Sequence, residues 1–234
     1  ITDTTVTDGR LMVHDNVEGF RRVLAFCRSR RIPLVYASSA AVYGVAEGRM
    51  SEEGTPPAPA NSYAFSKMIL DNLAREASEA DPDLHIVGLR YFNVYGPGEA
   101  HKGHSSSMIW QLAGQMASGA RPRLFKSGEQ KRDFVYVKDV VEATLLAAEC
   151  GYRGVYNVGS GRGRSFNELV EILNDVLGTG LEPRYIDNPY AFYQPFTEAD
   201  LTASSAALGY SPRWQLEEGV RDYIGGLTLP IGRT

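Results

Sequence analysis

Apolar and polar positions in the first hundred residues follow helical and strand periods in turn. Apolar side chains recur at helical spacing over residues 17–27, and the run IPLVYAS that follows is typical of a buried strand. A loop rich in Pro, Gly and Glu leads to a helix predicted over Ser62 to about Ala80, and LHIVGLRYF is the next strand, ending at Asn93. Both connections are too long for hairpins, so the pattern predicts strand–helix–strand crossovers and a parallel sheet.

The second half of the chain has shorter elements. Ser165 and Glu168 form a capping box that opens a helix running to Leu177. Strands are expected at RLF, DFVYV, VYNVG and EPRYI. Further helical stretches are expected at 108–118, 140–149, 201–207 and 216–227. We therefore expect an α/β fold: a parallel sheet with a smaller, mixed α/β region laid over it.

Composition excludes several classes of protein. With 43% hydrophobic and 22% charged residues among 234, the chain is neither disordered nor a coiled coil. A net charge of −4 gives no reason to expect nucleic acid or an anionic membrane as the main partner. No apolar run approaches the roughly 18 residues of a membrane span. The two cysteines, Cys27 and Cys150, are too few for a disulfide framework, which favours a reducing, cytoplasmic compartment.

Three segments partly match known functional motifs, but each match is incomplete. In VYNVGSGRGRSFNELV, Arg164 stands where a dinucleotide-binding GxGxxG loop needs its third glycine, so we interpret the segment as a structural turn. His101 and His104 have no carboxylate or thiolate cluster beside them, so we expect no metal site. The GSG segment also lacks the GxSxG elbow of the α/β-hydrolases.

Tyr63 and Lys67 form a stronger pattern, because residues four apart share one helical face. An ammonium near a phenol favours phenolate, so we expect Lys67 to lower the pKa of Tyr63 toward the range useful for proton abstraction. A half-buried tyrosine with a lysine extended along the surface is the alternative. Ser39 favours the catalytic interpretation, because it ends a parallel strand upstream, where ligands gather in open α/β sheets.

Five segments in order, YASSAAVYG, YAFSK, RYFNVYGP, RDFVYVKDVV and YNVGSG, resemble the extended short-chain dehydrogenase/reductase superfamily of nucleotide-sugar epimerases and dehydratases. The resemblance covers essentially the whole chain. DTTVTDGRLM, GPGEAHKG, KRDFVYV and FYQPFTEADLT make it most similar to the ADP-L-glycero-D-manno-heptose 6-epimerases. The resemblance implies a Rossmann-like sheet, with residues 1–103 forming the remainder of an NAD(P)-binding domain. Residues 104–234 would be mainly substrate-binding, with segments around 133–160 returning to the Rossmann sheet.

Members of this superfamily begin with a βαβ unit that carries the glycine-rich dinucleotide loop. Nothing precedes Ile1 in the printed sequence. We therefore expect the pyrophosphate cradle, and the residue that selects NAD or NADP, to lie outside it. The resemblance slightly favours NADP.

The resemblance also implies site residues. Ser39 would hydrogen-bond the reacting hydroxyl, Tyr63 would be an acid/base tuned by Lys67, and Lys102 would be a second acid/base. Inverting a carbinol centre by oxidation and re-reduction needs hydride returned to the opposite face of the transient ketone. The ketone must present its other face, and the proton then comes from a differently placed group, which is the reason for two. The residues implied for the cofactor are Asn16, Lys67 and Val94. Those implied for the substrate are Asn93, Phe125, Arg132 and Tyr193.

The expected activity is NAD(P)-dependent epimerisation at C6 of an ADP-heptose, a precursor of the lipopolysaccharide core. A UDP-hexose 4-epimerase remains an alternative, as do a nucleotide-sugar 4,6-dehydratase and a non-catalytic, cofactor-binding regulator. The loop AVYGVAEG lacks the Asp-Glu pair that a dehydratase would want. His104 and Gln111 stand where the nearest relatives would have Ser and His, which leaves the sugar's identity open. Relatives often pair through helices equivalent to 17–27 and 63–77, so we expect a homo-oligomer.

Overall fold

The first sheet of the computed structural model is parallel, and the structure describes residues 8–188 and 194–226. Its strands are β1 (Leu34–Ser39), β2 (Ile86–Tyr91) and β6 (Gly154–Val158), in the order β1-β2-β6. Ser39 pairs with Tyr91, and Tyr91 with Val158. The carboxyl ends of the three strands therefore meet at one edge of the sheet.

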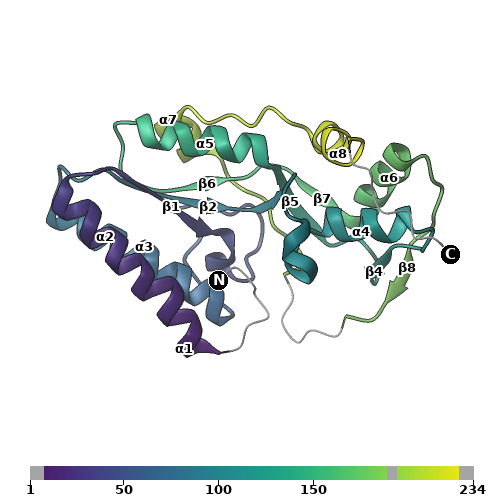
Figure 1. The fold of residues 1–234 in the computed structure, drawn as a ribbon, viewed down its shortest axis with the longest axis horizontal. Helices are drawn as coiled ribbons and strands as arrows, with labels where there is room; N and C mark the ends of the chain where they lie inside the picture. Colours follow the sequence, from purple (N-terminus) through teal and green to yellow (C-terminus); the bar gives the residue numbers. More distant parts are fainter. Residues whose placement is uncertain (1–7, 189–193, 227–234) are drawn as a thin grey trace.

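Helices cover both faces of this sheet, which explains why its strands are apolar with little alternation. Figure 1 shows α2 (Gly19–Arg30) and α3 (Ser62–Ala80) on one face, and α5 (Val137–Glu149) and α7 (Thr202–Leu208) on the other. One buried cluster joins α2 and α3 to the sheet through residues that include Leu24, Leu70, Ala74 and Ile86. A second joins α5 and α7 to it through residues that include Leu89, Ala143, Val158 and Leu208. The predicted α/β fold with a parallel sheet is confirmed.

The first helix begins earlier than the 17–27 pattern predicts. The α1 segment (Gly9–Met12) runs through a π-helical turn (Val13–Glu18) into α2, and the Asp8 side chain accepts hydrogen bonds from the amides of Arg10 and Leu11. Asn16 lies in the wide turn, and its Nδ2 donates to Ser66 Oγ of α3 at 3.0 Å. The π turn therefore brings Asn16 against α3, as such turns often do at functional sites.

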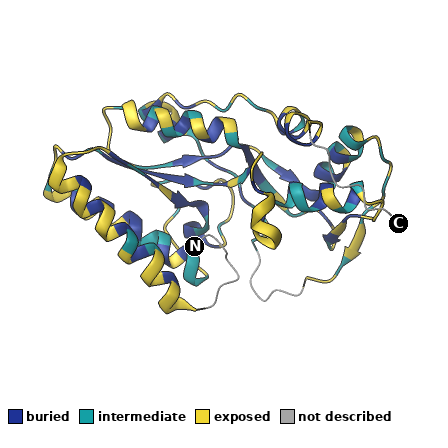
Figure 2. Ribbon diagram, viewed as in Figure 1, coloured by how far each residue is buried: buried dark blue, intermediate teal, exposed yellow. Residues whose placement is uncertain are grey.

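The smaller region, at the right of Figure 1, has its own core. Its strands are β3 (Asn93–Tyr95), β4 (Arg123–Phe125), β5 (Lys131–Tyr136), β7 (Gly163–Ser165) and β8 (Arg184–Ile186). Its helices are α4 (Met108–Ala117), α6 (Phe166–Leu177) and α8 (Leu216–Ile224). The order β3-β5-β7 makes one sheet, in which β3 and β5 are parallel and β5 and β7 antiparallel, and β4 pairs with β8. Figure 2 shows the buried faces of these helices turned toward the strands.

The predicted strand LHIVGLRYF ends differently in the structure. The chain leaves the first sheet after Tyr91 and enters the second at Asn93. Phe92, between them, donates its amide to the carbonyl of Val158 and packs in a cluster with Ala40 and Tyr43. The break therefore marks where the chain passes from one sheet to the other. Among the described residues, no helix is both long and apolar enough to cross a bilayer.

Candidate active site

Ser39 is the last residue of β1 and lies at the carboxyl edge of the parallel sheet. Its side chain caps a short 3₁₀ turn (Ala40–Tyr43), because Ser39 Oγ accepts a hydrogen bond from the amide of Ala41 at 3.2 Å. The register pairs Ser39 with Tyr91, two residues before Asn93. Ser39 and Asn93, far apart in sequence, therefore follow neighbouring strands to the same edge, where ligands bind in open α/β folds.

The structure brings Tyr63 and Lys67 to this edge on the first turns of α3. Asn61 begins the helix, accepting from the amide of Ala64 at 2.8 Å. Lys67 Nζ lies 5.7 Å from the centroid of the Tyr63 ring and donates to the carbonyl of Ala37 in β1 at 2.8 Å. The Tyr63 hydroxyl is hydrogen-bonded with Ser39. The three residues predicted from YASS and YAFSK therefore form one group.

The expected electrostatic effect within this group is corrected by the structure. Burial raises the pKa of Tyr63, and the hydrogen bond with Ser39 offsets this only in part. Burial likewise lowers the pKa of Lys67, against an opposing effect of the Asp71 carboxylate one turn further along α3. The prediction that Lys67 lowers the pKa of Tyr63 below its ordinary value is therefore wrong for this structure, because desolvation is the larger effect.

Four of the predicted cofactor and substrate residues line one pocket of about 430 Å³ in the smaller region. They are Asn93, Val94, Phe125 and Arg132. The guanidinium of Arg132 donates to the carbonyl of Lys131 at 2.8 Å. The last predicted substrate residue, Tyr193, lies outside the described residues.

The pocket also has polar lining residues that the sequence reasoning missed. Gln115, Arg123 and Gln130 belong to its wall. Arg123 and Phe125 stand two apart in β4, and side chains two apart in a strand share a face, so the strand period could have found Arg123. Gln115 accepts from the amide of Arg123 at 2.9 Å and so joins α4 to β4.

Lys102 lies apart from Tyr63, on an exposed 3₁₀ segment (Ala100–Ser105). It lines a small hollow of about 120 Å³ together with Val94, Glu99 and Val137. Val94 belongs to the walls of both this hollow and the larger pocket, so the two lie beside each other. His104, on the same segment, lines the larger pocket.

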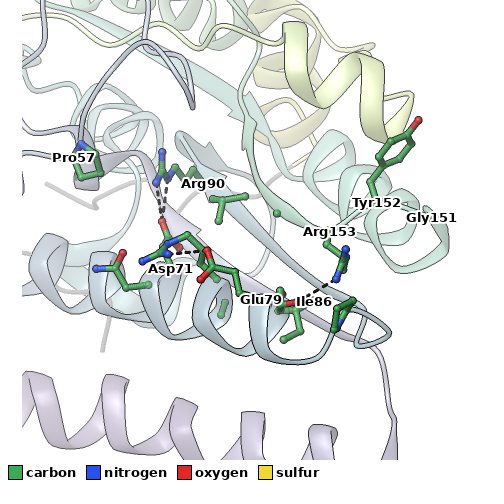
Figure 3. Close-up of a pocket in the computed structure, with 15 residues that line it drawn as sticks. Pro57, Asp71, Glu79, Ile86, Arg90, Gly151, Tyr152 and Arg153 are labelled. Atoms are coloured by element: carbon green, nitrogen blue, oxygen red, sulfur yellow. Dashed lines mark hydrogen bonds and ion pairs between the residues drawn. The ribbon is translucent and has the colours of Figure 1, made fainter.

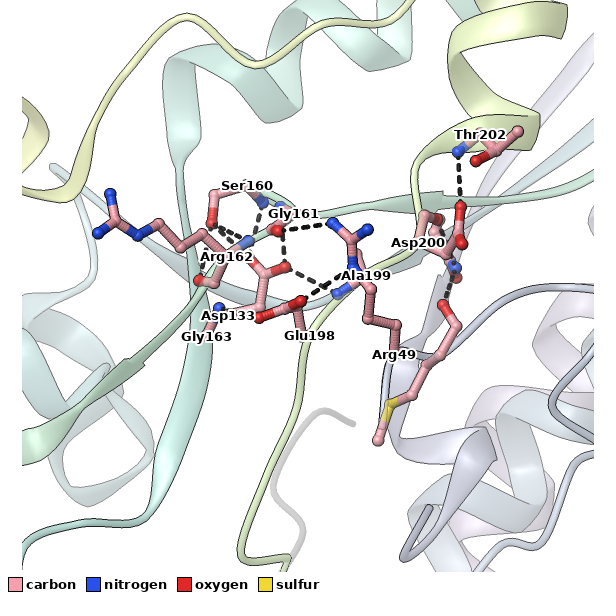
Figure 4. Close-up of polar contacts among 12 residues, drawn as sticks. Arg49, Asp133, Ser160, Gly161, Arg162, Gly163, Glu198, Ala199, Asp200 and Thr202 are labelled. Carbon is pink, nitrogen blue, oxygen red and sulfur yellow. Dashed lines mark hydrogen bonds and ion pairs between the residues drawn. The ribbon is translucent and has the colours of Figure 1, made fainter. Parts of the chain in front are cut away.

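The glycine-rich turn is a structural turn, as the missing third glycine predicts. Figure 4 shows the fully buried Asp133 carboxylate receiving the amides of Ser160 at 2.6 Å, Gly161 at 3.0 Å and Ala199 at 2.9 Å. The amide of Gly163 donates to Glu198 at 2.9 Å. A phosphate cradle needs such amides to point at the ligand. Here they are satisfied by carboxylates of the chain itself.

A larger pocket, of about 750 Å³, lies between α3 and the β6 end of the sheet (Figure 3). Four of its charged groups pair: Arg90 binds Asp71 at 3.0 Å, and Arg75 binds Glu79 at 2.8 Å. Arg153 donates to the carbonyl of Ser78 at 3.2 Å. None of the predicted site residues lines it. Size alone therefore does not identify the site. Among the described residues, no three His, Cys, Asp or Glu side chains are grouped as a metal site would require.

A family model described as "NAD dependent epimerase/dehydratase family" matches residues 2–159. The chain is similar to the crystal structure of Helicobacter pylori ADP-L-glycero-D-manno-heptose-6-epimerase, with 38% identity and a TM-score of 0.88 over 97% of this chain and 70% of that one. It is also similar to UDP-N-acetylglucosamine 4-epimerase from Methanobrevibacter ruminantium M1, with 27% identity and a TM-score of 0.86 over 96% of this chain and 74% of that one. A third similar structure is UDP-glucuronic acid 4-epimerase from Bacillus cereus, in complex with UDP-glucuronic acid and NAD. Its identity to this chain is 26% and its TM-score is 0.76, over 91% of this chain and 68% of that one.

Proposed function

The chain belongs to the NAD dependent epimerase/dehydratase family, and we propose that it acts as an ADP-L-glycero-D-manno-heptose 6-epimerase. The observation that carries this proposal is the gathering of a hydroxyl, a phenol and an ammonium at one edge of the first sheet. Ser39, Tyr63 and Lys67 gather at the sheet edge that leads into Asn93 and Val94, and Lys102 approaches Val94 from the neighbouring hollow. The 38% identity to the Helicobacter pylori heptose epimerase supports the sugar.

The side chains at the sheet edge fit the nicotinamide end of a dinucleotide. A phenol, a hydroxyl and an ammonium come from Tyr63, Ser39 and Lys67 at this edge, and an amide comes from Asn16, which lies against α3. These are the donors and acceptors that ribose hydroxyls and a carboxamide require. When bound, the nicotinamide ring accepts a hydride from the sugar and returns it. The family is NAD dependent, and the Bacillus cereus 4-epimerase is in complex with NAD. The NADP preference expected from the resemblance stays a prediction without that support.

Tyr63 and Ser39 would act at the reacting oxygen. Because burial raises the pKa of Tyr63, its hydroxyl carries the proton at neutral pH in this structure, ready to donate to an oxygen that becomes a hydroxyl. Ser39 would donate a hydrogen bond to the same oxygen while it is a carbonyl. Lys67, anchored to Ala37, would hold the ribose beside Tyr63.

Lys102 would serve the opposite face of the ketone, where the proton must come from a differently placed group. Arg132 would bind the substrate diphosphate, because a guanidinium presents a rigid fork of donors. Phe125 would pack against the substrate, and Asn93 would contact it at the junction with the cofactor.

We further propose a domain division, a cellular location, an assembly and a product. Residues 1–103 would form the remainder of the NAD(P)-binding domain, and residues 104–234 mainly the substrate domain, with segments around 133–160 returning to the first sheet. The protein would be a cytoplasmic homo-oligomer. Its product would be a lipopolysaccharide core precursor.

Incubation with separate nucleotide sugars tests the activity. The purified protein and its Tyr63→Phe variant receive cofactor and either ADP-D-glycero-D-manno-heptose, UDP-glucose or UDP-galactose, and the epimers are resolved by proton NMR. We expect the heptose to reach an epimer mixture and both UDP-hexoses to stay unchanged. Turnover of the UDP-hexoses alone would favour a 4-epimerase, an alternative supported by the TM-score of 0.86 to such an enzyme. Cofactor binding without any turnover would favour a regulator.

A further inference from the structure

The segment that carries Lys102 has no packing of its own. All six residues of Ala100–Ser105 are exposed, and none is buried within the turn. Gly103 reverses the chain directly after Lys102 with φ 55°, a left-handed conformation that favours glycine. His101 Nδ1 is hydrogen-bonded with the carbonyl of Gly98 at 2.8 Å, and further hydrogen bonds hold the turn near its two ends.

Glu99 holds the first end. It is 5% exposed, and its carboxylate accepts from the amide of Ser107 at 2.5 Å and from the Ser107 hydroxyl at 2.7 Å. Its main-chain carbonyl accepts from the amide of Lys102 at 2.9 Å. Ser107 is in turn the N-cap of α4, accepting from the amide of Trp110 at 3.2 Å. The Glu99 side chain therefore ties the start of the turn to Ser107, the second residue after it.

Tyr223 of α8 adds a third attachment to the same carboxylate. It is hydrogen-bonded with Glu99, and burial together with that carboxylate raises the pKa of Tyr223. The turn is thus connected to two helices of the smaller region through a single buried acid.

Gln111 holds the second end. Its Nε2 donates to the carbonyl of His104 at 3.1 Å and to the carbonyl of Ser106 at 2.8 Å. Gln111 lines the larger pocket, yet both hydrogens of its amide are directed at the main chain of the turn. Both donors of the Gln111 amide therefore hold main-chain oxygens of the turn.

We propose that Glu99 and Gln111 are positioning residues for Lys102, holding its turn so that the ammonium stays at the hollow beside Val94. This inference rests on the proposed function, which gives Lys102 its acid/base role. A lysine side chain has many rotamers, so a mobile backbone beneath it would spread the ammonium over many positions. A displacement of about 1 Å can cost roughly 10²-fold in rate.

Three variants test the proposal through the division between kcat and KM. Glu99→Ala removes the carboxylate, and Gln111→Met keeps the side-chain length without its donors. Glu99→Gln is the conservative variant, because its amide oxygen can accept from the Ser107 amide while its nitrogen donates to the Ser107 hydroxyl. We expect Glu99→Ala and Gln111→Met to lower kcat about 10- to 100-fold with KM within about threefold, and Glu99→Gln to recover most of the loss. Glu76→Gln, an exposed neutralisation on α3, is the matched control and should behave as native.

A second readout follows Lys102 without relying on turnover. The chain has five lysines, Lys67, Lys102, Lys126, Lys131 and Lys138, so reductive methylation with ¹³C gives a simple NMR spectrum in which Lys102→Met assigns one signal. We expect the Lys102 signal to move toward free dimethyl-lysine in Glu99→Ala and Gln111→Met. Native kcat and an unmoved signal in both variants would overturn the positioning role. Full epimerisation by Lys102→Met would instead overturn the proposed role of Lys102 itself, so the two failures are distinguishable.

Discussion

Lys67 Nζ donates a hydrogen bond to the main-chain oxygen of Ala37, 2.8 Å away, and so fastens helix α3 to strand β1. Tyr63, one turn earlier, is thereby held beside Ser39 by two regular elements and not by a loop. Sites built on helices and strands keep their geometry better than sites on loops. The rigid half of the proposed active site is therefore the Tyr63 half, and the exposed Lys102 turn is the half that needs separate support.

Removing the Tyr63 hydroxyl should stop catalysis without unfolding the protein. Tyr63→Phe keeps the ring and deletes the group that would transfer the proton. We expect epimerisation to fall about 10²- to 10⁴-fold, the usual contribution of a positioned acid/base. The free energy of unfolding from urea titration should fall by less than about 1 kcal/mol, since one hydrogen bond is lost. Turnover within about threefold of native would remove Tyr63 from the mechanism.

Ser39 should lower the pKa of Tyr63, because their hydrogen bond opposes the effect of burial. Ser39→Ala is therefore expected to raise the pKa of Tyr63 further above its ordinary value. With ¹³C at Cζ of the 13 tyrosines, the Tyr63 signal is assigned by its loss in Tyr63→Phe, and its titration is compared in native and Ser39→Ala protein. An unchanged or lower pKa in Ser39→Ala would contradict the proposed contact.

Local pattern was enough to predict much of the fold. The helix predicted from Ser62 to about Ala80 has those bounds in the structure, because Asn61 caps it and its apolar positions keep one face. The strand β7 (Gly163–Ser165) has no hydrophobic pattern, and it exists because β5 and Glu198 satisfy its backbone. The sequence also did not predict that the chain leaves the first sheet after β2 and enters the second at β3. The run around Phe92 is apolar throughout, and an apolar run does not indicate which sheet its residues join.

The candidate site, like the fold, was predicted only in part from the sequence. Helical spacing placed Tyr63 beside Lys67, and a strand end placed Ser39 near them. The direction of the Tyr63 pKa shift depends on burial by segments distant in sequence, so charge spacing alone predicted it wrongly. No sequence pattern indicated a role for Glu99 or Gln111, because each binds main-chain groups that come together only in the folded turn.

Asp133 should be essential for stability through its hold on the glycine turn. Asp133→Asn keeps the shape but replaces one acceptor oxygen by a donor that faces amides of Ser160, Gly161 or Ala199. At about 1–3 kcal/mol for each unsatisfied buried group, we expect a loss of about 2–4 kcal/mol in urea unfolding. Asp175→Asn, which breaks an exposed pair with Arg221, is the matched control and should cost less than about 1 kcal/mol. Equal losses in the two variants would contradict the assignment.

The raised pKa of Tyr43 should make the free energy of unfolding decrease at alkaline pH. The Tyr43 hydroxyl donates to Asn157 Oδ1 at 2.7 Å, and burial raises the pKa of Tyr43 to about 12. Between about pH 10, where unfolded tyrosine ionises, and about pH 12, the native state keeps a proton that the unfolded state has lost, so stability falls as pH rises. This window costs about 3 kcal/mol at about 1.4 kcal/mol per pH unit. In Tyr43→Phe the urea-derived stability should decline less steeply over this range, and parallel curves for the two proteins would refute the assignment.

Lys102 decides whether two opposed groups serve the two faces of the ketone. Lys102→Met keeps the aliphatic stem and removes the ammonium, so the fold should be unaffected at this exposed position. We expect net epimerisation to fall about 10²- to 10⁴-fold, because one of the two proposed proton-transfer groups is lost. Proton NMR of the two epimers measures the loss.

The matched control is Lys138→Met, which removes an exposed ammonium paired with Asp222 at 2.7 Å and should epimerise at the native rate. A solvated loop lysine with no chemical role makes the opposite prediction, namely equal turnover by Lys102→Met and Lys138→Met. That result would leave Tyr63 as the sole proton-transfer group. Inversion requires the ketone to present its other face to the hydride in either case, so Tyr63 would then have to reach the ketone oxygen in both orientations of a substrate whose diphosphate Arg132 is proposed to bind.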